Sequence, residues 1–247
     1  MIHTALTIAG SDPSGGAGIQ ADLRTFASVG VEGMAVPVSL TAQNAKGVFG
    51  VFHVPVEFVA LQLDYVMSDA RTGAVKTGML GTAATVAVVT AKLREYAITQ
   101  LVVDPVMVST SGTRLLDLDA IAVLKSDLLP LALLVTPNLS EAEILTGLAV
   151  NDIGGMERAA RKLREMGVPN VVVKGGHLEG NATDVFFDGR EILHLEARRI
   201  PTSGVRGTGC MLSAAITAHL AQGVPLIEAI RLGKEFVTRS IAERANG

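Results

Sequence analysis

Only one cysteine, Cys210, occurs among the 247 residues of the sequence. A single thiol cannot form an internal disulfide, which fits a reducing compartment. The first residues, MIHTALTIAGSDPSGG, lack the basic region and apolar stretch of a signal peptide. No apolar run reaches the roughly 18 residues that a membrane helix needs. These absences predict a cytoplasmic protein with no membrane segment.

Clustered positive charge is also missing. The formal net charge is −3, and lysine and arginine form no basic patch in the sequence, which argues against a nucleic-acid-binding surface. Hydrophobic residues make up 49% and charged residues 18%, so the chain can build a large core. There is no linker, repeat or low-complexity segment. We therefore expect a single domain over residues 1–247.

Short β-branched runs alternate with longer helical patterns. Helices are predicted over 82–96 and 153–166, from Pro55 to about residue 69, and at about 208–222 and 225–243. The helix at 153–166 is expected to carry Glu157–Arg161 and Arg161–Glu165 pairs on its outer face. Predicted strands cover residues 3–9, 33–41, 73–77, 100–104, 131–136 and 170–176. The alternation predicts an α/β fold with a mostly parallel sheet covered on both faces.

Residues 183–196, TDVFFDGREILHLE, depart from this alternation. Two alternating runs flank Asp188 and Gly189, a pair that favours a tight turn between antiparallel strands. The segment therefore predicts an antiparallel hairpin at one edge of the sheet.

Polar and glycine-rich residues follow nearly every predicted strand. Ligands of open α/β sheets bind at the carboxyl ends of the strands, so these residues are expected to meet at one edge. Carboxylate oxygens suit Mg²⁺, a lysine neutralises phosphate, and the N–H groups at a helix start bind anions. The edge therefore predicts a phosphate-transfer site. Its members are GSDPSGGAGIQAD, Asp104, Asn138, Glu141, Lys174 and RGTGC.

Each of these residues also has an ordinary structural explanation. Asp104 precedes a proline and can cap a turn. Asn138 and Glu141 have the spacing of a helix capping box. Lys174 can be a solvent-facing strand end, and Cys210 can be a small core residue. The convergence of all of them on one sheet edge favours a functional site.

Three rival ligand sites find little support in the sequence. A P-loop requires Gly-Lys-Ser/Thr, which does not occur. GAGIQA at 16–21 fits a dinucleotide pattern, but its turn is long and TAQN stands where an acidic ribose ligand is expected. Zinc is disfavoured because there is no second cysteine and the histidines, at positions 3, 53, 177, 194 and 219, are scattered.

Seven motifs in order, AGSDPSGGAGIQADL, TAQN, KTGML, VVDPVMVSTSG, TPNLSEAE, VKGGH and GTGCMLSAAI, resemble the hydroxymethylpyrimidine/phosphomethylpyrimidine kinases of thiamine biosynthesis. That family belongs to the ribokinase-like superfamily, and the resemblance covers essentially the whole chain. It implies a three-layer αβα fold and a homodimer. It also implies that ATP, with Mg²⁺, phosphorylates 4-amino-5-hydroxymethyl-2-methylpyrimidine and then its monophosphate.

The resemblance also implies roles for individual residues. The pyrimidine pocket would include Gly10, Asp22, Gln43, Met79, Val106 and Met107. Magnesium would be governed by Asp104, Asn138 and Glu141. The ATP phosphates would meet Lys174, Thr208 and Arg206. The anion hole would be formed by Gly207, Thr208 and Gly209, followed by Cys210 at the position where many superfamily members carry an aspartate base.

The role of Cys210 stays open at this point. A helix N-terminus lowers a thiol pKa, which makes Cys210 a candidate base for the hydroxymethyl group. Phosphoryl transfer depends mainly on positioning and electrostatics, so a strong base is not required. We therefore predict that Cys210 lies beside the reacting oxygen, either as a base or as a positioning group. Two departures from the family pattern lie nearby: Arg206 replaces a common histidine, and Met211 a common threonine.

Other functions remain open on the same residues. A vitamin B6 kinase is one alternative, because pyridoxine also carries a ring hydroxymethyl group. A non-catalytic pyrimidine-binding module is another, although the intact transfer residues argue against it, namely Asp104, Glu141, Lys174 and Gly207–Cys210. The partners expected in every case are small molecules, with no nucleic acid and no membrane.

Overall fold

The computed structural model describes residues 2–44, 46–69, 72–109, 112–176, 178, 180–201 and 207–246. Its strands form one nine-stranded sheet in the order β3-β2-β1-β4-β5-β6-β7-β8-β9. The strands are β1 (Thr4–Ser11), β2 (Glu32–Asn44), β3 (Gly47–His53), β4 (Ala74–Thr77), β5 (Leu101–Val103), β6 (Leu134–Val135), β7 (Val171–Val173), β8 (Asp184–Phe187) and β9 (Ile192–Leu195). The central strands β2, β1, β4, β5, β6 and β7 run parallel to one another. Strands β3, β8 and β9 are antiparallel additions at the two edges.

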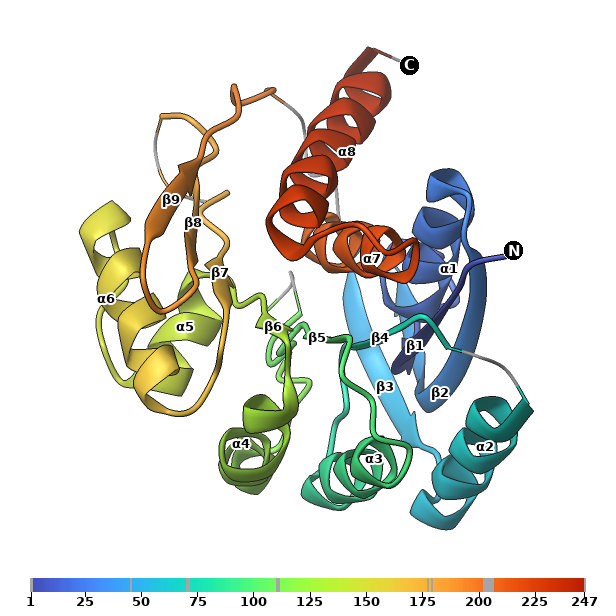
Figure 1. Cartoon of the computed structure of the whole chain (residues 1–247). Coiled ribbons are helices and arrows are strands. Elements are labelled where there is room, and N and C mark those ends of the chain that lie inside the picture. Colours follow the sequence, from blue (N-terminus) through green and yellow to red (C-terminus); the bar gives the residue numbers. More distant parts are fainter. Residues whose placement is uncertain are drawn as a thin grey trace.

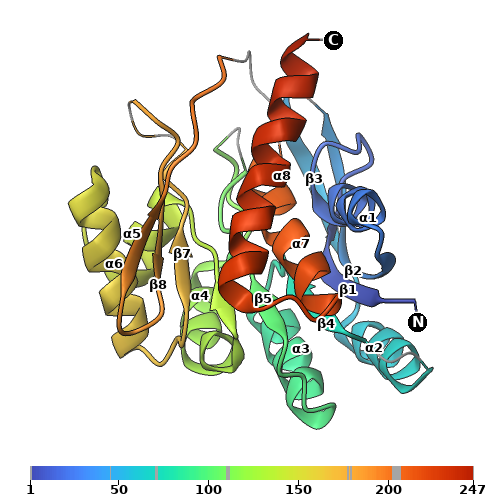
Figure 2. The ribbon, with the colours of Figure 1, turned by 45° about the horizontal axis from the view of Figure 1, so that its top comes forward.

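Helices cover both faces of the sheet, as predicted (Figure 1). One face carries α1 (Gly18–Val29), α7 (Thr208–Ala221) and α8 (Leu226–Asn246). The opposite face carries α2 (Val56–Asp69), α3 (Ala83–Glu95), α4 (Leu118–Val123), α5 (Leu139–Thr146) and α6 (Ile153–Glu165). Figure 2 shows α7 lying across the middle of the sheet beside α1. None of the helices in the described part of the chain combines the length and the apolar composition needed to cross a membrane.

The structure confirms the fold class and the antiparallel hairpin at β8–β9. It also contains an element that the sequence analysis missed, the edge strand β3, which pairs with an extension of β2. The predicted strand at 131–136 is reduced to β6, because Leu129–Leu131 forms a 3₁₀ turn after a π-helical turn at Leu124–Leu128.

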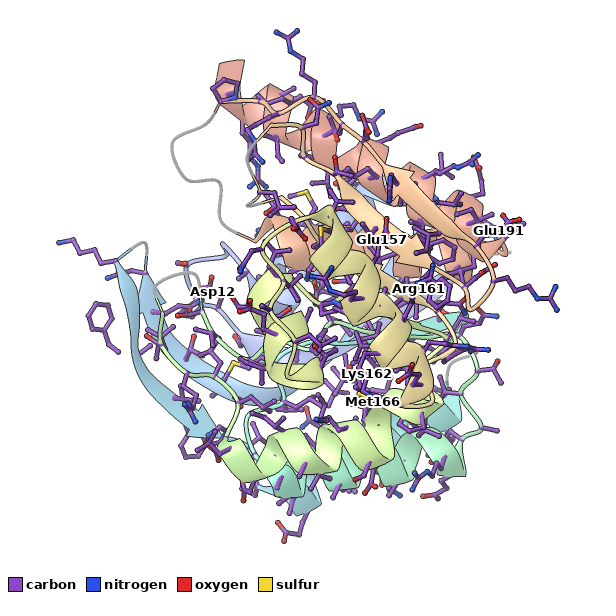
Figure 3. The ribbon with its side chains drawn as sticks, turned by 90° about the vertical axis from the view of Figure 1, so that its left-hand side faces the viewer. Asp12, Glu157, Arg161, Lys162, Met166 and Glu191 are labelled. Atoms are coloured by element: carbon purple, nitrogen blue, oxygen red, sulfur yellow. The ribbon has the colours of Figure 1, made fainter. Side chains whose placement is uncertain are left out.

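The outer face of α6 differs from the prediction (Figure 3). The Glu157–Arg161 and Arg161–Glu165 pairs are not among the ion pairs of the described residues. Instead, the Arg161 guanidinium lies 5.0 Å from the centre of the Phe187 ring, and Nε2 of His194 lies 2.9 Å from Oε1 of Glu157. Both contacts join α6 to the β8–β9 hairpin, so packing replaced the expected pairs along the helix.

Candidate active site

A row of polar side chains lies at the carboxyl ends of the central strands, on the face that α7 covers. Successive strand residues point to opposite faces, so a residue two positions after a buried apolar one shares its face. Ala5, Ala74, Val102, Leu134 and Val172 all pack in the core under α1, α7 and α8. Two residues after each of them stand Thr7, Lys76, Asp104, Thr136 and Lys174. Strand alternation therefore places these five polar residues side by side, as the strand order requires.

Half-buried Lys174 and buried Asp104 form an ion pair in this row. The Lys174 Nζ donates to Oδ1 of Asp104 at 2.6 Å. The hydroxyl of Ser213, on α7, donates to Oδ2 of Asp104 at 3.0 Å, and that of Thr136 lies 3.4 Å from Oδ1. Burial opposes ionisation of Asp104, but Lys174 and Lys76 hold the pKa of its carboxyl below the usual value. The sequence analysis identified Asp104 and Lys174 but not Ser213.

Asn138 and Glu141 form the capping box that the sequence spacing allowed. The side chain of Asn138 accepts from the Glu141 N–H at 2.9 Å, and Glu141 Oε2 accepts from the Asn138 N–H at 2.8 Å. The same carboxylate lies 4.0 Å from the Lys174 Nζ. Burial raises the pKa of Glu141 to about 7, with Lys174 opposing the shift and Asp104 adding to it. Glu141 is therefore both part of the capping box of α5 and a neighbour of the polar row.

The first turn of α7 lies over this polar row, and the glycines of the turn allow the close approach. Gly207 adopts a left-handed conformation with φ of 78°, and a Cβ there would collide with the carbonyl oxygen of Gly16 in the first loop. A Cβ on Gly209 would lie 3.2 Å from the Lys174 Nζ. The ammonium group is thus next to the first turn of α7, whose N–H groups have no partner within the helix. An ammonium beside a helix N-terminus is suited to bind an anion.

Cys210 lies half-buried on the same turn. The expectation that the helix N-terminus lowers its pKa is wrong, because burial raises the pKa of this thiol to about 12. Lys76 and Lys174 oppose the shift, whereas Asp104 and Asp22 add to it. Cys210 is therefore a neutral thiol at pH 7.

Asp22 was assigned to the pyrimidine pocket, and in the structure it is fully buried on α1. Its Oδ2 accepts from the Lys76 Nζ at 2.8 Å and from the Thr7 hydroxyl at 2.6 Å. The sequence analysis missed Lys76. Its signal was a lysine in the apolar run GAVKT, two positions after the core residue Ala74, just as Lys174 stands two positions after the core residue Val172.

The first loop is held by Asp12, a residue of the predicted segment GSDPSGGAGIQAD to which the sequence assigned no individual role. Its carboxylate accepts from the Ser14 N–H at 2.9 Å, the Ser14 hydroxyl at 2.7 Å and the Ala17 N–H at 2.9 Å, and it also interacts with the Gln43 side chain. Burial opposes ionisation of Asp12, but these bonds lower its pKa overall. Figure 3 shows Asp12 beside the β2–β3 hairpin. The loop is thus fixed against the strand that carries Gln43.

The remaining predicted pocket residues lie around this loop and the β4 and β5 ends. Gly10 adjoins Met79, since a Cβ on Gly10 would lie 3.1 Å from the Met79 Sδ. Met79 is almost buried, Val106 is half-buried, and Met107 packs within the core on the other face of the sheet. Arg206 lies outside the described residues.

Two carboxylates of the site, Asp104 and Glu141, supply oxygen atoms of the kind that magnesium binds. Among the described residues, no cluster of three His, Cys, Asp or Glu side chains could hold a metal on its own. Asp104 and Glu141 are nevertheless two carboxylates around one ammonium, Lys174, so a divalent cation fits the charge of the site. Mg²⁺ commonly uses one or two carboxylates and completes its shell with water and substrate phosphates. The residues present therefore fit a cation that arrives with a phosphate ligand.

Comparison with known proteins gives the same chemistry. The family model described as phosphomethylpyrimidine kinase matches residues 12–246. A hydroxymethylpyrimidine/phosphomethylpyrimidine kinase of Rhizobium meliloti is 51% identical over 244 residues, which cover 98% of this chain and 91% of that protein. The thiamine biosynthesis bifunctional protein ThiED of Geobacter sulfurreducens is 50% identical over 239 residues, which cover 96% of this chain but 49% of that protein. An ADP complex of Bacillus subtilis pyridoxal kinase has a TM-score of 0.89 and 38% identity, covering 96% of this chain and 91% of that one.

Proposed function

The chain belongs to the phosphomethylpyrimidine kinase family, and we propose that it phosphorylates 4-amino-5-hydroxymethyl-2-methylpyrimidine and then the resulting monophosphate, with ATP as donor, in thiamine biosynthesis. The observation that carries the proposal is the place of the Lys174 ammonium. It lies between the first turn of α7 and the carboxylate of Asp104, 2.6 Å from Oδ1. A transferred phosphoryl group needs this combination of N–H donors and fixed positive charge.

The acceptor would bind between the first loop and the β2–β3 hairpin. Gln43 offers an amide that can both donate to a ring nitrogen and accept from an amino group. Asp12 fixes the loop against Gln43, and Gly10 and Met79 supply close, mainly apolar contacts. Asp22 supports this pocket from below through Lys76 and Thr7 and is not placed on its surface. These contacts favour a flat, polar-edged ring near the start of α7.

The phosphoryl group would bind at the N–H groups of Gly207, Thr208 and Gly209, with Lys174 beside them. Asp104 and Glu141 would hold Mg²⁺ through oxygen, Asn138 would orient Glu141, and the cation would neutralise phosphate charge. Arg206 is proposed to lie near the same phosphates. As a neutral thiol, Cys210 is suited to contact the reacting hydroxyl, and the positioned groups supply most of the rate.

A homodimer is part of the proposal. The β2–β3 hairpin and α2 expose large apolar side chains, with Phe49 70%, Phe52 63%, Phe58 55% and Tyr65 72% exposed. Strand β3 is also the edge of the sheet. A second copy of this chain is the proposed cover for this surface. Phe52→Glu is then expected to convert a dimer into a monomer in light scattering, and an unchanged mass would contradict the placement.

The functional test is release of ADP from Mg-ATP with three acceptors: the hydroxymethylpyrimidine, its monophosphate and pyridoxal. Turnover of both pyrimidines well above pyridoxal is expected. Turnover of pyridoxal alone would replace the proposal with a vitamin B6 kinase, a function favoured by the likeness to the Bacillus subtilis enzyme. Pyrimidine binding without any turnover would leave a binding module.

A further inference from the structure

Lys76 is a buried lysine that has no assigned role in the proposed phosphoryl transfer. Its side chain is completely buried, a state that lysine almost never adopts unless it is paired. The Nζ donates to Oδ2 of Asp22 at 2.8 Å, and the Thr7 hydroxyl donates to the same oxygen at 2.6 Å. Burial disfavours the ammonium, but the neighbouring negative groups, Asp22 first among them, together raise the pKa of Lys76, so the group stays charged.

Strand register and packing place this charge on the face of the sheet that α7 covers. Lys76 pairs with Thr7 on β1 and with Val102 on β5, two residues before Asp104. A Cβ on Gly78 would lie 3.3 Å from the Lys76 Nζ, so the glycine of KTGML leaves space for the ammonium. Helix α7 packs on β4, and Lys76 interacts electrostatically with Cys210 as well as with Asp22 and Asp104.

A contribution to folding stability does not explain why Lys76 and Asp22 form a buried ion pair. Removing two charges from water costs several kcal/mol per ion, and an apolar pair of similar volume is often equally or more stable. Oδ1 of Asp22 is buried without a hydrogen-bond partner among the described residues, which adds to the cost. A charge held at such cost acts strongly on its surroundings, because screening in the interior is weak.

We propose that Lys76 is a positioning residue whose ammonium, fixed by Asp22 and Thr7, stabilises negative charge at the first turn of α7 where Cys210 lies. The charged groups that face Cys210 are Lys76 from β4, Asp22 from α1, Asp104 after β5 and Lys174 after β7. Of these, Lys76 acts most strongly on Cys210. The catalytic consequence of this charge rests on the proposed kinase function, but its effect on Cys210 does not.

Cys210 offers a direct probe, because it is the only thiol in the chain. The rate of alkylation by iodoacetamide reports the fraction of thiolate, and mass spectrometry measures it without ATP or a pyrimidine. The Lys76→Met/Asp22→Asn double variant removes both charges and leaves neither unpaired. Since Lys76 outweighs Asp22 at Cys210, alkylation at pH 9 should fall about threefold to tenfold, up to one unit of thiol pKa. Lys76→Arg keeps the charge and should restore most of the rate.

The sign of the effect separates this role from a structural one. A loosened core would expose Cys210 and accelerate alkylation, whereas the proposal predicts a slower reaction in a folded protein. Lys92→Met, which breaks the half-buried pair with Asp64 between α2 and α3, is the matched control and should leave the rate unchanged. An unchanged or faster rate in the folded double variant would overturn the proposal.

A catalytic readout follows where the kinase is active. In the double variant kcat should fall about tenfold while KM for the pyrimidine changes little, because the charge acts on the group at α7 and not on ring binding. An inactive wild-type enzyme would refute the proposed function and leave the alkylation result standing. A rise in KM alone with unchanged kcat would contradict a role at the first turn of α7.

Discussion

The two faces of the sheet are built by the same strands and do different work. On the face covered by α2 to α6, residues such as Val75, Val103 and Val135 are packed in an apolar cluster. On the face covered by α1, α7 and α8, the neighbouring positions Lys76, Asp104 and Lys174 meet as buried charges. The strands alternate between the faces one residue at a time.

The comparison shows how the same strands can carry an apolar core on one face and the charged groups of the candidate active site on the other. The apolar face gains free energy by excluding water, and the strand residues that it buries, such as Val75, Val103 and Val135, carry no charge. On the other face, the burial of charged groups offsets part of that stabilisation. The electrostatic fields of these groups are strong because the groups are buried. Substitutions should therefore separate by face: those near α7 should change activity most, and those near α2 to α6 should change stability.

Lys174→Met should have the largest effect on activity. It removes the ammonium at the start of α7, and kcat should fall by about 100-fold to 1000-fold, as for the loss of a donor to transition-state charge. Steady-state ADP release measures the loss. Lys162→Met, on the exposed surface of α6, is the control and should retain wild-type activity. A loss below fivefold for Lys174→Met would show that the phosphoryl group binds elsewhere.

Leu63→Ala tests the apolar face with the opposite pattern. Leu63 of α2 is completely buried, so truncation should lower the free energy of unfolding by about 2–5 kcal/mol. Urea unfolding measures the change, and kcat of the folded protein should stay within twofold. A kcat loss that matched Lys174→Met in a folded protein would mean that the two faces are not separable.

The pH dependence of Cys210 sharpens the picture of the charged face. Burial raises its pKa to about 12, so the thiolate fraction at pH 7 to 10 is small and should grow about tenfold with each pH unit. Alkylation of the wild-type protein by iodoacetamide should therefore accelerate throughout this range. A plateau near pH 8 would instead indicate a low thiol pKa and would restore Cys210 as a candidate base.

Asn138→Ala should have the smallest of these effects on stability. It removes a helix N-cap, which costs about 1 kcal/mol by thermal or urea unfolding. It also releases Glu141, so the concentration of Mg²⁺ needed for half-maximal activity should rise. Asn138→Asp keeps an acceptor at the cap and should recover the stability. Wild-type magnesium dependence in Asn138→Ala would limit Asn138 to its cap.

Strand alternation explains why much of the site was visible in the sequence. Asp104 and Lys174 end nearly pure valine runs, and a parallel sheet brings such ends together. Lys76 has the same position, yet its motif alone does not tell which carboxylate it meets, because Asp22 reaches it from a helix 54 residues earlier. Tertiary partners of this kind are not written in a local pattern.

Burial and edge pairing account for the other differences. The thiol of Cys210 has the helix start that lowers a pKa, but the depth of its site reverses the sign, and depth depends on packing. Strand β3, GVFGVFH, has mostly exposed side chains and forms only because β2 extends beyond the core to pair with it. Neither the burial of Cys210 nor the pairing of β3 can be predicted from the spacing of residues in the sequence.

The most direct test of the account is to follow the products of the wild-type protein with Mg-ATP and 4-amino-5-hydroxymethyl-2-methylpyrimidine by ³¹P NMR. The account predicts a monophosphate that appears first and is then converted to the pyrophosphate at the same site, with stoichiometric ADP. Accumulation of no phosphorylated pyrimidine, under conditions in which the folded protein binds the ring, would contradict phosphoryl transfer at the α7 turn.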